Sequence, residues 1–561
     1  MNLRPSAQAL PSQRPLAGGV RPLARAGART WRALVVIACL AMLLGAPVPQ
    51  IDSDTPLSGE IAQHILATGD WLTLRYPVHY SSAIVDKPPL TYWLMAVSIW
   101  LGGPTNAALR LWCILMAMLL VLTVYGLARL DCSEEESLLA ALIMATFQQV
   151  FYETSLAPQH DIPVTLFLTL TFYSYLRYRR DGRARWTLLA GFWAALAVLT
   201  KGILFLPGIL GVVAADALLA WRRGERPRWR VRHVAAGGLV FTLAAAPWFV
   251  VEALRLGPPF LRMMLVGAGG LERLRHPFLG AGFAGLEGYV AAWLAYVPLL
   301  IVGMLPWTAL LPGAIAQGWR SLRGDAPSAR LSAVWFALYF AAISLSQGDR
   351  SARYLLPCYP PLALLAGRAL AGALARGARL GAGSLLLPLL GPLALWAGVW
   401  VARRSSPVEM QAYTPILVPI LAVLTLVVVA LTVLAGRGLL RQAVALAAAG
   451  SVLSYTVTYA MLVERWAPLW PWPAIGATVN RLYHPGDRVL IVGRYTAEAN
   501  LAAYWIRPPI ERVDDDALVA AWHRERILAL LAPDRLAALR DRLHPTVLLR
   551  TPMGWSLVTN R

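Results

Sequence analysis

A polar, proline-punctuated segment near the start of the chain carries the motifs Asp54-Thr-Pro-Leu-Ser-Gly-Glu-Ile-Ala62, Gly69-Asp-Trp71 and Asp86-Lys-Pro-Pro-Leu-Thr-Tyr-Trp93. It follows the first hydrophobic stretch of membrane-spanning length, and nearly everything after it is apolar. A loop of this length between apolar stretches is typical of an active site rather than of a simple connection.

The composition is that of a polytopic membrane protein. Of the 561 residues, 58% are hydrophobic and only 14% are charged,. The formal net charge of +21 would suit a nucleic-acid-binding protein. The arginines, however, cluster in short loops between apolar stretches, as the positive-inside rule expects. We therefore predict contact with membrane lipids and no nucleic-acid partner. The four cysteines have no metal-ligand spacing, and they predict no disulfide framework.

The apolar stretches predict about thirteen transmembrane helices. A basic cytosolic tail, residues 1–30, precedes a first span at roughly 31–48, which is typical of a retained signal anchor. Residues 88–102 are apolar but short, and they either cross the membrane or lie along it. If they do not cross, five arginine-rich segments fall on the side of the N-terminal tail, which favours this alternative. These segments are 177–185, 222–232, 320–330, 368–379 and 437–441. Loop 129–136 would then also lie on the side of the N-terminal tail, although it contains acidic residues where the rule expects basic ones.

The remaining spans are expected near 107–128, 137–153, 162–178, 186–200, 203–221, 233–252, 288–312, 330–346, 354–372, 383–402, 413–435 and 440–463. Residues 31–465 form one transmembrane domain in this interpretation, with a first outer loop at 49–106 and a long outer loop at 253–287. An interfacial helix is expected near 59–68.

Residues 466–561 are predicted to form a small α/β domain on the outer side. Strands are expected at 488–493, 526–531, 546–550 and 555–559, and helices at 498–504 and 534–543.

Two acidic positions in the first outer loop are candidates for chemistry. Asp54 is a general base or a stabiliser of positive charge in one interpretation, and a solvated acid or helix N-cap in the other. Asp86 and Lys87, held by a diproline, would position a phosphate and a divalent metal, or form an ion pair that anchors the loop.

Three further candidates follow in later segments. Asp161 begins a span and is either a site residue or a helix N-cap. Lys87 and Lys201 are the only lysines among 51 basic residues, which favours a need for a compact ammonium group,. The alternative for Lys201 is a snorkelling side chain. Arg353 would clamp a phosphate with its guanidinium, or lie in a solvated loop.

The chain lacks a Walker loop, a GxGxxG motif, CxxC pairs and a Ser-His-Asp set. Cytosolic nucleotide chemistry is therefore not supported. The candidates all fall on the outer side, a placement that suits a substrate with a phosphate head and a lipid tail.

The motifs quoted above resemble the first periplasmic loop of the GT-C membrane glycosyltransferases. The nearest branch is the aminoarabinose transferases of lipid A, and the dolichyl-phosphate-mannose protein mannosyltransferases are more distant. Other similar stretches are Asp161-Ile-Pro163, Leu199-Thr-Lys-Gly202, Leu305-Pro-Trp-Thr-Ala-Leu-Leu-Pro312, Arg353-Tyr-Leu-Leu-Pro-Cys-Tyr-Pro-Pro361, Gly493-Arg-Tyr495 and Ala503-Tyr-Trp-Ile-Arg-Pro508.

The resemblance implies that Asp54 is the catalytic carboxylate. It also implies that Asp86, Lys87, Asp161, Lys201 and Arg353 line the site of the donor phosphate and sugar. The donor would be a sugar on undecaprenyl phosphate, and the acceptor lipid A or another envelope molecule. The reaction would be an inverting transfer on the periplasmic side of the bacterial inner membrane.

The chain departs from the family pattern in three places. The family's first motif usually reads Asp-Glu-x-Arg-Tyr, where this chain has Asp54-Thr-Pro-Leu-Ser58. Its second usually has Glu-Lys, where this chain has Asp86-Lys87. Gly267-Ala268 stand where the family has an acidic/His pair. No cofactor is required by these motifs, and a divalent metal stays an open alternative.

Two other functions are alternatives to this one. A protein O-mannosyltransferase would act on Ser or Thr hydroxyls, for which base catalysis by Asp54 matters more than for an ionised lipid phosphate. A non-enzymatic transporter of a lipid-linked substrate would show inverted repeats and polar residues at the centre of the membrane. Neither of those transporter features is evident in the sequence.

Overall fold

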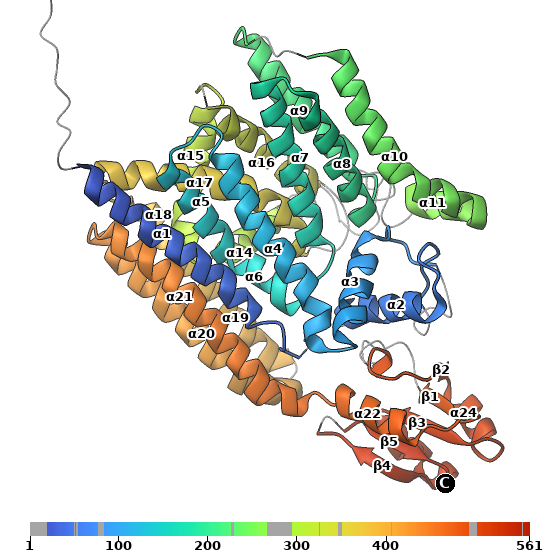
Figure 1. Cartoon of the computed structure of the whole chain (residues 1–561). Helices are drawn as coiled ribbons and strands as arrows, with labels where there is room; N and C mark the ends of the chain where they lie inside the picture. Colours follow the sequence, from blue (N-terminus) through green and yellow to red (C-terminus); the bar gives the residue numbers. More distant parts are fainter. Residues whose placement is uncertain are drawn as a thin grey trace, which may run out of the picture.

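The computed structural model describes residues 20–49, 51, 54–76, 84–225, 229–265, 294–324, 326–345, 351–405, 407–492, 502–552 and 554–561. Residues 266–287 of the predicted outer loop, including Gly267 and Ala268, lie outside this part. So does most of the predicted helix 498–504. Within the described part, a large helical body is joined to a small C-terminal domain, and α2 and α3 lie between the two (Figure 1).

The helices of the body follow the apolar stretches of the sequence. By length and composition, seven described helices can cross a membrane, or eight if a pair bent by 114° forms one span. That pair is Tyr296–Gly303 and Trp307–Ser321, in place of the single straight span expected near 288–312. The total of thirteen spans stays a prediction. The longer helices are α1 (Val20–Leu43), α4 (Asn106–Ala128), α5 (Glu134–Thr146), α7 (Asp161–Asp181), α8 (Ala184–Lys201), α9 (Phe205–Arg222), α10 (Val231–Leu256), α15 (Leu311–Ser321), α16 (Pro327–Leu345), α17 (Tyr359–Arg376), α19 (Leu390–Ser405), α20 (Pro407–Gly436) and α21 (Leu440–Met461).

Two shorter helices form the first outer segment. The predicted interfacial helix is α2 (Asp54–Thr68), which begins five residues earlier than expected. The apolar stretch 88–102 forms α3 (Leu90–Gly102), whose 13 residues are fewer than the roughly 20 needed to cross a bilayer,. The interpretation in which 88–102 does not cross is therefore the one that its length favours.

The acidic loop before α5 has a structural explanation. Ser133 and Glu136 form a capping box, so the acids occupy the first turn of the helix, where they stabilise its unpaired N–H groups,. Asp131 accepts a hydrogen bond from the backbone N–H of Ser328 at 2.6 Å. Glu134 pairs with Arg32 of α1. These acids therefore cap and join helices, and they do not contradict the positive-inside assignment.

Small residues allow the helices to approach closely. A Cβ placed on Gly367 of α17 would lie 2.7 Å from the backbone nitrogen of Ala140 in α5. Residues Ser137 to Thr146 of α5 are all buried. Without a hydrophobic driving force between helices in lipid, such close backbone contact is a main source of association.

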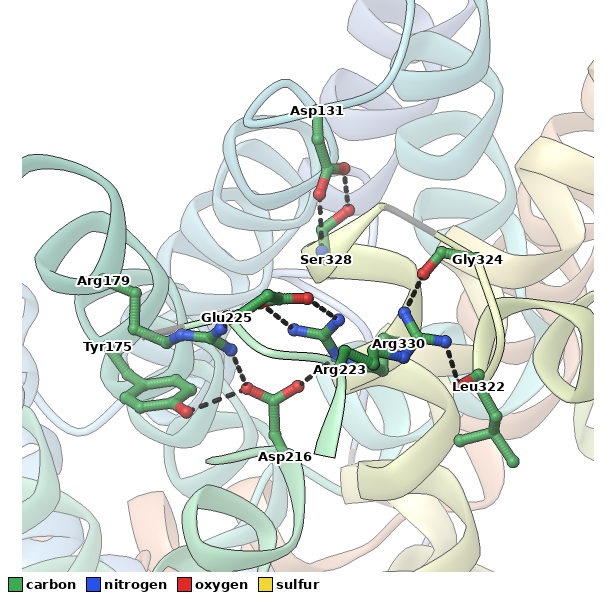
Figure 2. Close-up of polar contacts among 10 residues, drawn as sticks. All are labelled: Asp131, Tyr175, Arg179, Asp216, Arg223, Glu225, Leu322, Gly324, Ser328 and Arg330. Atoms are coloured by element: carbon green, nitrogen blue, oxygen red, sulfur yellow. Dashed lines mark hydrogen bonds and ion pairs between the residues drawn. The ribbon is translucent and has the colours of Figure 1, made fainter. Parts of the chain in front are cut away.

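A buried ion-pair network joins α7, α9 and α16 (Figure 2). It lies at the end of the bundle away from α2 (Figure 1). The Arg330 guanidinium of α16 donates to Asp216 of α9 at 3.0 Å and to Glu225 at 2.6 Å. Arg179 of α7 pairs with the same two carboxylates, and the Tyr175 hydroxyl donates to Asp216 at 2.8 Å. The side chains of Arg330 and Asp216 are completely buried.

This network brings the arginine-rich segments 177–185, 222–232 and 320–330 together at one end of the body. Arg223 adds hydrogen bonds to the carbonyl oxygens of Leu322 and Gly324 (Figure 2). From the sequence, these arginines predicted only the topology of the helices. Their role in joining the helices could not be predicted, because Asp216 lies within an apolar stretch and its partners are distant in the sequence.

The C-terminal domain is a five-stranded sheet with strand order β2-β1-β3-β5-β4. β1 pairs in parallel with β2 and β3, and β5 is antiparallel to β3 and β4. The predicted strands and the helix at 534–543 are confirmed. No element was predicted from the sequence at α22, β2 or α24. The elements are α22 (Trp472–Leu482), β1 (Arg488–Val492), β2 (Ile510–Val513), α24 (Asp515–Trp522), β3 (Ile527–Leu531), α25 (Pro533–Leu543), β4 (Thr546–Arg550) and β5 (Ser556–Thr559).

Replacing Arg330 by alanine will destabilise the helical body. Asp216 and Glu225 would lose one of the two guanidinium groups that they share. Removing one partner of a buried ion pair costs up to about 3–5 kcal/mol, and Arg179 would offset part of this cost because it still contacts both carboxylates,. We expect the apparent Tm of the detergent-solubilised protein to fall by several degrees. The control is Arg320→Ala on the neighbouring α15, because Arg320 is exposed and its loss should cost less than about 0.5 kcal/mol,. Equal Tm values for the two variants would contradict a stabilising role of the network.

Candidate active site

The carboxylate of Asp54 lies at the start of α2, where it meets two residues from distant segments. Gln159 donates to Asp54 Oδ2 from its side-chain nitrogen at 3.1 Å, and Arg353 Nη1 lies 3.3 Å from the same oxygen. Arg353 also donates to the Gln159 side-chain oxygen. The Asp54 side chain is 52% exposed, so these contacts orient the carboxylate and leave it open to a substrate.

Asp161 and Lys201 form an ion pair beside this group. Asp161 is the first residue of α7 and Lys201 the last of α8, and their side chains are 2% and 14% exposed. The Lys201 ammonium also lies 4.7 Å from the ring centre of Tyr354, the neighbour of Arg353. The alternative of Asp161 as an N-cap is wrong, because His160 occupies the cap position and makes no side-chain cap bond.

Asp86 and Lys87 pair with each other at the edge of the group. Their charged atoms are 3.0 Å apart, and the Tyr76 hydroxyl donates to Asp86 at 3.2 Å. Both side chains are partly exposed. Within the described ranges, no cluster of three His, Cys, Asp or Glu side chains could hold a metal ion. Asp86 and Lys87 therefore pair with each other, and both alternatives for them, phosphate binding and loop anchoring, stay predictions.

The imidazole of His160, the residue before Asp161, is buried and is affected by the cations of the site. Its ring packs edge-on against Tyr92, with 5.3 Å between ring centres, and it is almost fully buried. Burial is the main reason that the pKa of His160 lies well below its usual value,. The positive charges of Lys87, Lys201 and Arg353 lower this pKa further, so the ring is neutral at neutral pH.

Two polar residues that contribute to this arrangement were not predicted as site residues. Gln159 bridges Asp54 and Arg353, and His160 lies between Gln159 and Asp161. The signal available in the sequence was a Gln-His-Asp run directly before an apolar span. Only the acid of that run was chosen, because an amide carries no charge and has no distinctive spacing.

A buried arginine holds the two segments that lead into the site. Arg110 of α4 donates to the carbonyl oxygen of Ser155 at 2.6 Å and to that of Pro49 at 3.1 Å. Pro49 precedes Asp54, and Ser155 precedes Gln159. Arg110 was not predicted as a site residue, although a charge inside a membrane-length apolar stretch is an indication of function or of a specific partner.

The six predicted candidates thus form three direct pairs: Asp54 with Arg353, Asp161 with Lys201, and Asp86 with Lys87. The Tyr354 ring, next to Arg353 in the sequence, connects the first two pairs. The arrangement offers an open carboxylate beside an arginine and a partly buried lysine. A phosphate could replace the carboxylates as the partner of these cations, while Asp54 faces a second reactant.

Comparisons with known proteins agree with the motifs. Residues 86–250 match the family model described as dolichyl-phosphate-mannose-protein mannosyltransferase. An undecaprenyl phosphate-alpha-4-amino-4-deoxy-L-arabinose arabinosyl transferase of Pseudomonas aeruginosa (strain UCBPP-PA14) is 31% identical over 61% of this chain and 60% of its own length. A protein of the same name from Edwardsiella ictaluri is 29% identical over 60% of this chain and 58% of its own length. The matches thus span about three fifths of these curated relatives.

The fold is similar to two solved structures. The crystal structure of ArnT from Cupriavidus metallidurans bound to undecaprenyl phosphate has a TM-score of 0.73 and 21% identity, over 95% of this chain and 98% of that one. The apo state of the same protein has a TM-score of 0.72 and 20% identity, over 94% and 97% of the two chains. The fold that the motif resemblance implies is therefore confirmed. The chain has the GT-C fold of ArnT over both its multi-pass helical body and its C-terminal α/β domain.

Proposed function

We propose that this protein is an inverting glycosyltransferase that takes a sugar from a polyprenyl-phosphate donor and delivers it to an envelope acceptor. The observation that carries the proposal is the half-exposed Asp54 carboxylate held by Arg353 and Gln159 beside the Asp161–Lys201 pair. We assign undecaprenyl phosphate as the donor carrier and aminoarabinose, or a related sugar, as the group transferred. This assignment is supported by the names of the relatives and by the ligand of the similar ArnT structure.

In this mechanism, the bond between the anomeric carbon and the donor phosphate breaks as the acceptor oxygen attacks from the opposite face. Negative charge grows on the departing polyprenyl phosphate. Lys201 and Arg353 stabilise that charge from within the site, and Lys87 does so from its edge. Such fixed cations are most effective in a region with little water, and the Lys201 side chain is only 14% exposed,.

Asp54 orients the acceptor and its attacking oxygen. A lipid A phosphate is already ionised at neutral pH, so the carboxylate does not need to remove a proton from it. A hydroxyl acceptor would need that step, which is the chemistry of the protein O-mannosyltransferase alternative. We favour the phosphate acceptor, because the curated relatives are arabinosyl transferases and the mannosyltransferase family model matches only residues 86–250.

We place the site and the C-terminal domain on the periplasmic side of a bacterial inner membrane. Helix α7 is not one of the seven helices that are apolar enough by themselves to cross a membrane. Its 21 residues are about 30 Å long, however, so its two ends lie about one thickness of the hydrocarbon core apart,. Asp161 begins this helix in the site, and Arg179 lies near its other end in the arginine-rich network. The positive-inside rule then puts the network in the cytosol and the site outside.

Replacing Asp54 by asparagine will reduce sugar transfer by about 10²-fold or more if the carboxylate orients or activates the acceptor. Gln159→Ala should cause a smaller loss, because Arg353 would still contact Asp54. The measurement is transfer of radiolabelled sugar from polyprenyl phosphate in detergent. The control is Asp541→Asn, which changes an exposed acid on α25 of the C-terminal domain. Full turnover by the Asp54 variant would refute a catalytic role.

Replacing Lys201 by methionine will weaken binding of polyprenyl phosphate by at least tenfold, because a charge-assisted contact is worth about 1.5–3 kcal/mol. The single variant also strands the buried Asp161 carboxylate, so its Tm should fall. The double variant Asp161→Asn with Lys201→Met removes both charges and should recover much of the Tm but not the affinity. Wild-type affinity in the double variant would show that Lys201 has only a structural role.

Lipid A from cells that contain the protein should carry a mass addition of one aminopentose on its phosphate groups, and lipid A from cells without it should not. Mass spectrometry of lipid A measures this difference directly. Cells that produce the Asp54→Asn variant provide the matched control, since they contain the folded protein. An unchanged lipid A together with altered glycosylation of envelope proteins would instead support transfer to hydroxyl groups.

A further inference from the structure

We infer that Tyr504 of the C-terminal domain is a positioning residue for Asp54, because its ring and hydrogen bonds fix the helix that Asp54 begins. The catalytic part of this inference rests on the proposed function. The contact itself does not, since it is a property of the fold.

Tyr504 belongs to the C-terminal domain by sequence but to the helical body by packing. It is 1% exposed and lies in the apolar core formed by the helices of the body, which includes Ile61 and Ile65 of α2. The buried residues of the sheet belong to other clusters. A domain that merely rested on the body would not place one of its aromatic side chains within the core of the body.

The hydrogen bonds of Tyr504 reach both helices between which its ring lies. Its hydroxyl donates to the carbonyl oxygen of Thr105 at 3.2 Å, and Thr105 caps the start of α4. Its backbone carbonyl accepts a hydrogen bond from the side chain of Gln63 in α2 at 3.0 Å. The residue therefore bridges α2 and α4.

Gly59 provides the space for the ring on α2. A Cβ at this position would lie 2.7 Å from the Tyr504 ring and 2.7 Å from a methyl group of Leu109 in α4. A glycine in the middle of a helix is unfavourable relative to alanine, so its presence here is explained by the aromatic ring packed against it.

The other side of the contact is anchored in the domain. Asn480 of α22 donates to the carbonyl oxygen of Trp505 at 3.0 Å and accepts from the N–H of Arg507 at 2.8 Å. The segment that carries Tyr504 is thus held to α22, which leads from the last helices of the body into the sheet (Figure 1).

Asp54 lies on the same 15-residue helix, five residues before Gly59. A helix of this length moves as a unit, so a tilt that fills the space left by the ring would also shift the Asp54 carboxylate. Its contacts with Gln159 and Arg353 are 3.1 and 3.3 Å long. A displacement of about 1 Å at a reacting group can lower a rate by about 100-fold.

The first test is hydrogen exchange of the α2 amides in the full-length protein in detergent. We expect Tyr504→Leu to speed exchange of residues 54–68 by at least tenfold. The matched control is Trp522→Leu, which removes a buried aromatic ring and its hydrogen bond to Leu543 from the other core of the same domain. It should speed exchange only within the sheet domain. Wild-type exchange of α2 in Tyr504→Leu would overturn the inference.

A second pair of variants leaves the domain untouched. Gly→Ala within a helix ordinarily slows exchange by stabilising the helix. Gly102→Ala in α3 should follow this rule, since its Cβ would meet Ala108 at an ordinary 3.7 Å. Gly59→Ala should do the opposite and speed exchange of α2, because the new methyl group meets a ring and a branched side chain. Slower exchange in Gly59→Ala would contradict the close fit.

The final test is a double-mutant cycle on sugar transfer. Tyr504→Leu should lower kcat by at least tenfold in the wild-type background, and by less than twofold once Asp54 is already asparagine. Tyr504→Phe, which keeps the ring, should retain most of the turnover. An equal loss in both backgrounds would show that Tyr504 does not act through Asp54. A wild-type protein without transfer activity would contradict the proposed function, and the two exchange tests would still decide whether Tyr504 fixes α2.

Discussion

A charge that is removed from water must find a partner of opposite sign, and this constraint shapes both ends of the helical body. Asp161 and Asp216 are almost completely buried carboxylates, and each is held by a cation from another helix. Each pairing is costly to break, because the remaining charge would stay in a region of low dielectric. These contacts therefore fix how α7, α8, α9 and α16 lie against one another. Because Asp161 begins α7 and Lys201 ends α8, the packing of these helices determines where both site residues lie.

The two ends use this constraint differently. In the arginine-rich network, Asp216 and Glu225 are shared between Arg179 and Arg330, so the guanidinium forks are fully engaged. In the candidate active site, at the other end of the body, the described cations have fewer carboxylate partners. Within the part of the chain that the structure describes, Arg353 contacts an exposed carboxylate, and Lys201 contacts one carboxylate and an aromatic face. A cation whose N–H groups are not all bound to carboxylates can still bind a phosphate. A cation whose N–H groups are all bound can only stabilise the fold.

The first outer segment is held from three directions. Arg110 fixes the chain before Asp54 through the Pro49 carbonyl, Gln159 and Arg353 hold the carboxylate, and Tyr504 reaches α2 from the C-terminal domain. These residues come from widely separated parts of the sequence. A helix of 15 residues is marginal in isolation, so such tertiary contacts determine its position,. The position of α2, and with it that of Asp54, is thus determined by contacts from distant parts of the chain.

The sequence by itself determined the membrane class, the approximate bounds of most helices and the six candidate charges, because apolar periodicity and rare lysines are local properties of the chain. It also determined the resemblance to the GT-C glycosyltransferases, since the motifs are contiguous. The tertiary structure alone decided that Asp161 pairs with Lys201 rather than capping α7, and that Gln159 bridges Asp54 and Arg353. It likewise decided the roles of Arg110, Asp216 and Tyr504. The partners named above lie 37 or more residues away in the sequence, and no local pattern encodes which of many distant groups will meet once the helices pack.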